Sequence, residues 1–113
     1  MPQLIECGTE LIRINSSNNS IEYSRDGRNW VRRCTSKAYG TFLDLCLFGS
    51  MIYAVTTKGV YFSKDKGLNF TCKCNSTAYG NFQTIMVRGT ELYAQTSKGL
   101  YASKDEGRNW VRK

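Results

Sequence analysis

The sequence repeats itself, and the repeat limits what the chain can fold into. Residues 49–70 align without a gap with residues 89–110, at an offset of 40 residues. Upstream of each segment, residues 38–42 match residues 78–82 at the same offset. A more diverged copy comes first, because residues 8–11 match residues 89–92 and residues 24–33 match the end of the chain with a turn one residue shorter. Three copies, 1–34, 35–74 and 75–113, therefore fill the 113 residues.

Each copy predicts four short strands separated by turn residues. In the second copy we expect strands at Phe42–Phe48, Met51–Thr56, Val60–Ser63 and Asn69–Cys74. No segment has a sustained helical period, and glycines stand where tight turns need a positive φ. The predicted fold class is all-β, with three four-stranded antiparallel units per chain, each the size of one β-propeller blade.

Three blades leave two open faces, because propellers usually close with about four to eight blades and each blade buries its faces only against neighbours. We expect a head-to-tail homodimer, in which the third blade of each chain packs on the first blade of the other and completes a six-bladed ring. A two-fold axis permits this closure, since it uses both unlike faces of each chain. The alternative is that the chain is a fragment of a longer propeller.

Composition excludes several classes of function. The chain has no His, which excludes Ser-His-Asp and Cys-His catalysis and His-based metal sites. It has no run of about 18 apolar residues and no signal-peptide pattern, so we expect a cytoplasmic protein without a membrane partner. Of the five cysteines, Cys72 and Cys74 form a C-x-C pair with no second pair at zinc-ligand spacing. We therefore expect reduced, buried thiols, no metal and no cofactor.

The turn before the last strand of each copy resembles the Asp-box, or bacterial neuraminidase repeat, with the signature S-x-D-x-G-x-x-W. The matching residues are Ser24, Asp26, Gly27 and Trp30, then Ser63, Asp65, Gly67 and Phe70, then Ser103, Asp105, Gly107 and Trp110. In such a turn a short Asp side chain can accept backbone N–H bonds, Gly takes the left-handed position and the aromatic ring packs on the sheet. The resemblance implies a structural turn on the rim opposite the usual ligand face. We thus interpret the three Asp residues as turn formers.

The same resemblance implies that the other loops of each blade surround a central channel, on the face where ligands usually bind. The chemistry-bearing residues expected there are Lys37, Tyr39, Lys58, Tyr79 and Lys98. Tyr offers a surface for stacking, Lys offers positive charge, and neighbouring Asn, Ser and Thr offer hydrogen bonds. This set suits a nucleotide, an acidic sugar or an acidic peptide. The alternative is that the two tyrosines anchor loops and the lysines are solvated.

The net charge of +7, from 16 Lys and Arg against 9 Asp and Glu, favours an anionic partner. Many of these cations fall in the Asp-box turns or on outer strands, where lysines and arginines usually protect a solvated edge. A spread of positive charge of this kind supports a nucleic-acid partner only weakly.

The sequence therefore predicts a non-catalytic binding module that holds an anionic ligand or a macromolecular partner on its central face. The alternative is a sequestering or inhibitor protein of viral or mobile-element origin, acting on a nucleotide, nucleic-acid or protein target. A sialidase-like glycosidase is less favoured. The resemblance implies an arginine triad for such an enzyme, and away from the turns and outer strands the chain offers only Arg13 and Arg88.

Overall fold

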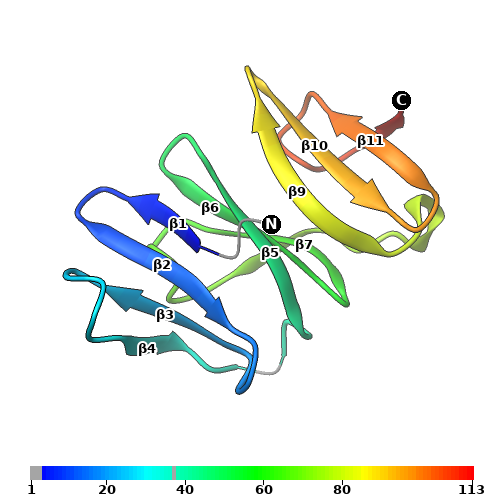
Figure 1. Ribbon diagram of the computed structural model, residues 1–113. Coiled ribbons are helices and arrows are strands. Elements are labelled where there is room, and N and C mark those ends of the chain that lie inside the picture. Colours follow the sequence, from blue (N-terminus) through cyan, green and yellow to red (C-terminus); the bar gives the residue numbers. More distant parts are fainter. Residues whose placement is uncertain (1–3, 37) are drawn as a thin grey trace.

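The computed structural model describes residues 4–36 and 38–113, which form three four-stranded antiparallel sheets (Figure 1). Sheet 1 contains β1 (Leu4–Cys7), β2 (Glu10–Asn15), β3 (Ser20–Ser24) and β4 (Val31–Cys34). Sheet 2 contains β5 (Phe42–Phe48), β6 (Met51–Thr56), β7 (Gly59–Ser63) and β8 (Thr71–Cys74). Sheet 3 contains β9 (Phe82–Arg88), β10 (Glu91–Thr96), β11 (Gly99–Ser103) and β12 (Val111–Arg112). A short 3₁₀ turn, η1 (Thr77–Tyr79), precedes β9. Each sheet is a meander whose strands lie in chain order, so the all-β fold class is confirmed.

The last strand of sheet 2 begins two residues later than the alternation of side chains predicts. Asn69 belongs to the preceding turn and not to the strand, because its backbone N–H and its side-chain amide donate to the two carboxylate oxygens of Asp65, at 2.9 and 3.0 Å. β8 therefore begins only at Thr71, where the backbone is free to pair with Phe62.

A register shift in the same strand separates the C-x-C pair. Cys72 lies opposite Tyr61, and Cys74 lies opposite the neighbouring residue Val60. Val60 and Tyr61 are successive residues of β7 and therefore face opposite sides of the sheet, and so do the cysteines opposite them. Cys74 is buried, whereas Cys72 is exposed. The expectation that all five thiols are buried is therefore wrong for Cys72, and all five are free.

Sheet 2 is the middle layer of the molecule (Figure 1). Its β5 and β6 pack against β9 of sheet 3, and β5 also packs against β1 and β2 of sheet 1. The core towards sheet 3 is a cluster of buried residues that includes Tyr53, Val55, Ile85, Leu92 and Ala94. A second cluster towards sheet 1 includes Ile12, Ile14, Ile21, Leu45 and Ile52. Both faces of sheet 2 are thus covered within one chain.

The carboxylate of Asp44 joins the first strands of sheets 2 and 3, β5 and β9. Its side chain is fully buried, and its two oxygens accept the backbone N–H groups of Leu45 and Ile85, each at 3.0 Å. Burial raises the pKa of Asp44, and the two N–H donors oppose that shift. This carboxylate satisfies a backbone donor that would otherwise be buried without a partner.

Sheets 1 and 3 each leave one face without a neighbouring sheet in the chain. On these two faces the large apolar side chains are partly open to solvent: Leu4 and Met86 are each 53% exposed, and Leu100 is 42% exposed. The equivalent positions of sheet 2 are covered by sheet 1 or sheet 3. The outer two sheets therefore carry apolar surface that the described residues do not bury.

Candidate functional site

The turns between the third and fourth strands share one hydrogen-bond pattern, and we call them the Asp turns (residues 24–30, 63–70 and 103–110). In each, a serine hydroxyl donates to the Asp carboxylate, at 2.7–3.0 Å, and accepts the N–H of the turn glycine, at 2.8–2.9 Å. The same carboxylate accepts the backbone N–H and the side-chain amide of an Asn. Both carboxylate oxygens are therefore used inside the turn.

These hydrogen bonds favour the ionised form of the three carboxylates. The backbone N–H of Asn109 is the main cause that lowers the pKa of Asp105 to about 2. The backbone N–H of Asn29 likewise holds the pKa of Asp26 below its ordinary value. For Asp65, burial opposes ionisation, but hydrogen bonds from Asn69 and Ser63 outweigh it and lower the pKa. The geometry assigns all three carboxylates a local structural task.

The opposite end of each sheet carries the loops that the sequence predicts as the ligand face. In sheet 2 the N–H of Thr41 donates to Thr57 Oγ1, and the N–H of Thr57 donates to the carbonyl of Thr41, both at 3.0 Å. In sheet 3, Asn81 and Ser97 form the same reciprocal pair, both at 2.9 Å. We call these loop pair 2 (residues 38–41 with 56–59) and loop pair 3 (residues 78–81 with 96–99).

A lysine closes each loop pair. Lys58 Nζ donates to the carbonyl of Ala38 at 3.3 Å, and Lys98 Nζ donates to the carbonyl of Ala78 at 3.4 Å. Both lysine side chains are exposed, and each passes over the glycine of its loop pair, Gly40 or Gly80. A Cβ placed on Gly80, whose φ is +90°, would lie 3.0 Å from Lys98 Cγ and 2.7 Å from Ser97 Oγ. The glycine lets the lysine lie flat on the loop, so the ammonium group is held at the rim of the loop face.

Tyr39 and Tyr79 anchor the same loops. Tyr39 packs edge-on against Tyr61 and Phe70, with ring centroids 5.5 Å apart in both pairs, and its hydroxyl accepts the N–H of Phe70 at 3.2 Å. Tyr79 repeats the arrangement, with its hydroxyl accepting the N–H of Trp110 at 3.4 Å. Each half-buried tyrosine thus sits beside the lysine of its own loop pair, while a stacking role towards a ligand stays a prediction.

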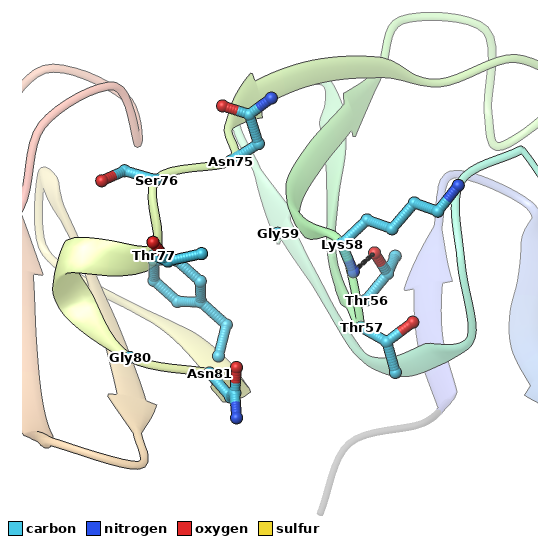
Figure 2. A pocket seen from close by; sticks show the side chains of 10 residues that line it. Thr56, Thr57, Lys58, Gly59, Asn75, Ser76, Thr77, Gly80 and Asn81 are labelled. Atoms are coloured by element: carbon cyan, nitrogen blue, oxygen red, sulfur yellow. Dashed lines mark hydrogen bonds between the residues drawn. The ribbon is translucent and has the colours of Figure 1, made fainter.

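A small hollow of about 40 Å³ lies between loop pair 2 and the loop that leads into sheet 3 (Figure 2). Its lining is made of hydroxyl, amide and glycine residues with one aromatic side chain and one lysine: Thr56, Thr57, Lys58, Gly59, Asn75, Ser76, Thr77, Gly80, Asn81 and Phe82. None of these residues carries a carboxylate. Since a water needs roughly 10–15 Å³ by this measure, the hollow has room for a small group and not for a whole nucleotide.

Figure 2 shows how the polar groups are arranged around the hollow. Asn75, Ser76 and Thr77 line one side, and Thr56 and Thr57 line the other. The Lys58 side chain extends away from Asn75 and Ser76, towards the loop that carries Ala38. Its backbone N–H donates to Thr56 Oγ1 at 2.9 Å. The ammonium group therefore stands at the margin of the hollow and not inside it.

The structure places four of the predicted ligand residues in two groups, each with one lysine and one tyrosine. Lys58 lies with Tyr39, and Lys98 lies with Tyr79, each within its own loop pair. Lys37 lies outside the described residues. The residues that sequence reasoning missed are Asn75, Ser76 and Asn81. The available signal is the polar run that follows the last strand of the first and second copies, Thr35-Ser36 and Asn75-Ser76.

No protein-family model matches this chain, and no curated protein matches it. In residues 4–36 and 38–113, no group of three or more His, Cys, Asp or Glu side chains is placed to hold a metal ion. Across the same residues, no helix is long and apolar enough to cross a bilayer. The candidate site therefore rests on the loop geometry itself.

Proposed function

We propose that this protein is a non-catalytic binding module that holds a small anionic group on its loop face. The observation that carries the proposal is the hollow beside loop pair 2, where hydroxyl and amide groups converge and Lys58 is the charged residue among the described lining residues. Hydroxyls, amides and ammonium groups are donors that suit a phosphate, sulfate or carboxylate. An anion there meets no competing carboxylate among the lining residues.

The hydroxyl groups of the hollow retain donor capacity. Thr56 Oγ1 and Thr57 Oγ1 each accept a backbone N–H bond, and a hydroxyl that accepts can still donate its own proton. Lys58 Nζ is held by one long bond to the carbonyl of Ala38. An ammonium group has three donors, so rotation of this exposed side chain brings charge towards an anion at small cost.

Calorimetric titration with inorganic phosphate tests the proposal. We expect binding to weaken at least about tenfold when Lys58→Ala is combined with Lys98→Ala, because both loop-face ammonium groups are lost. Lys64→Ala is the matched control, since it removes the same charge from an Asp turn at the other end of sheet 2 and is expected to leave binding unchanged. Equal affinities for the double variant and the unaltered protein contradict the proposal.

We further propose that the three sheets are blades of an Asp-box β-propeller and that a head-to-tail homodimer completes a six-bladed ring. The shared hydrogen bonds of the Asp turns and the two uncovered sheet faces support this assembly. Sheet 2 provides the pattern for a blade that is covered on both sides. Light scattering across a concentration series is expected to give twice the chain mass, and a chain mass throughout contradicts the dimer.

A further inference from the structure

We propose that the uncovered face of sheet 3 binds the uncovered face of sheet 1 in a second copy of this chain, with Met86 packing beside Leu4 and Arg88 pairing with Glu6. This inference rests on the head-to-tail dimer proposed above and deepens it by naming the residues that meet. The internal repeat supplies the argument, because the junction between sheets 2 and 3 shows how two such faces fit.

The junction between sheets 2 and 3 shows which strands and which faces meet. The hydrogen bond from the N–H of Ile85 to Asp44 Oδ2, at 3.0 Å, sets β9 against β5. Further along these strands, Cys46 and Phe48 of β5 and Val87 of β9 lie in the same apolar cluster. On β5 these side chains project from the face that carries Tyr53, and on β9 from the face that carries Leu92, as the strand pairing requires.

The alignment of the three copies identifies the equivalent positions on the two uncovered faces. On sheet 3, at an offset of 40 residues, Met86 stands where sheet 2 has Cys46, and Arg88 stands where it has Phe48. On sheet 1, at an offset of 81 residues, Leu4 stands where sheet 3 has Ile85, and Glu6 stands where it has Val87. A second copy docked by the same geometry therefore places Met86 and Arg88 on the face that meets the face of Leu4 and Glu6.

The two faces match in chemical kind at each of these positions. Met86 and Leu4 are both apolar and each is 53% exposed in the single chain, so their contact removes apolar surface from water. Arg88 and Glu6 are both exposed and carry opposite charges. Phe48 and Val87, which pack against one apolar cluster at the internal junction, are thus replaced on the uncovered faces by residues of opposite charge, which favour one register.

A third pair of positions follows the same rule. At the internal junction Val55 and Ala94 belong to one buried cluster, and their equivalents on the uncovered faces are Gln95 and Arg13. Arg13 is already neutralised, because its guanidinium pairs with Glu22 at 2.9 Å and lies 4.0 Å from the ring centroid of Trp30. A polar amide therefore meets a paired guanidinium, and the contact buries no isolated charge.

The occupant that fits is a second copy and not an unrelated protein. A face shaped for an unrelated partner has no reason to be complementary to the chain's other uncovered face at the three pairs of positions that the internal repeat relates. Docking of sheet 3 on sheet 1 is a head-to-tail contact, and it closes as a ring of two chains when a two-fold axis relates them.

Sedimentation velocity across a concentration series tests the pairing with Arg88→Glu, Glu6→Arg and the chain that carries both changes. We expect each single change to raise the Kd of the dimer about tenfold or more, because it places like charges together, and the double change to restore it to within about threefold. Lys64→Glu is the matched control for charge reversal and is expected to leave the Kd unchanged. Circular dichroism checks that each variant is folded.

The outcomes separate this inference from the proposals on which it rests. An unaltered protein that dimerises, together with single variants that dimerise equally well, overturns the named pairing and leaves the dimer standing. An unaltered protein that stays monomeric overturns both the pairing and the dimer. A second variant, Met86→Lys, is expected to weaken the dimer without touching the ion pair, and an unchanged Kd counts against the apolar contact. Phosphate binding is measured separately and decides neither result.

Discussion

The hydroxyl of Tyr53 donates a 2.7 Å hydrogen bond to the backbone carbonyl of Glu106, and this bond joins the core of sheet 2 to the Asp turn of sheet 3. Tyr53 is fully buried, and burial raises its pKa to about 12. A Cβ placed on Gly107, where φ is +95°, would lie 3.3 Å from Tyr53 Cε2. The Asp turn thus does more than reverse the chain, because its backbone forms part of the contact between sheets.

Removal of this hydroxyl is expected to destabilise the fold. Tyr53→Phe keeps the ring and its packing but leaves the Glu106 carbonyl without its donor, which costs about 1–2 kcal/mol in the free energy of unfolding. Chemical denaturation measures the change. Glu106→Gln is the matched control, since it alters the side chain and keeps the carbonyl that accepts the bond. A Tyr53→Phe protein as stable as the original contradicts a structural role for the bond.

The Asp turns predict a loss of stability in acid. The folded-state pKa of Asp105 is about 2 and that of Asp65 is also lowered, whereas an Asp in an unfolded chain titrates near 3.9. The stabilisation is fully present above the unfolded pKa and disappears as the pH falls towards the folded value, because the unfolded chain binds protons first.

Thermal unfolding at pH 7, 4 and 2.5 measures this dependence. We expect the unaltered protein to lose stability mainly between pH 4 and pH 2.5. Asp105→Asn presents an amide donor to the Asn109 amide, so it is expected to lower the melting temperature at pH 7 and to reduce the difference between pH 4 and pH 2.5. An equal acid dependence in the two proteins argues against the turn carboxylate as its cause.

Two glycines with positive φ are expected to differ in how much an added methyl group destabilises the fold. A Cβ on Gly59, where φ is +134°, would lie 2.2 Å from the carbonyl oxygen of Cys74, a backbone atom that cannot move aside cheaply. We expect Gly59→Ala to cost about 3 kcal/mol in unfolding free energy, from clash and strain together. At Gly49, with φ +63°, no atom lies within 4 Å of the added Cβ, so Gly49→Ala is expected to cost only about 1 kcal/mol. Equal costs contradict the close approach of the strands.

The repeat predicted the three sheets because periodic glycines and alternating apolar residues act locally, and each strand needs only its neighbour in the chain. The direction in which an individual side chain points depends on contacts with residues far away in the sequence, so the repeat does not predict it. Tyr39 precedes its sheet in sequence, yet its hydroxyl accepts the N–H of Phe70, 31 residues later. Lys58 stays a predicted ligand residue, and the bond from its ammonium group to the carbonyl of Ala38 is a contact that the repeat does not predict. Nothing in a single sequence encodes these long-range acceptors.

The register shift in β8 predicts that one thiol per chain reacts quickly. Cys72 is exposed, whereas Cys46 is buried and burial raises its pKa to about 12, which leaves almost none of the reactive thiolate at pH 8. With a disulfide reagent at pH 8 we expect a fast phase of one thiol and a slow phase set by opening of the sheets. Cys72→Ser is expected to abolish the fast phase and Cys46→Ser to leave it intact. A fast phase that survives Cys72→Ser means that another strand opens readily, and it contradicts the register described for β8.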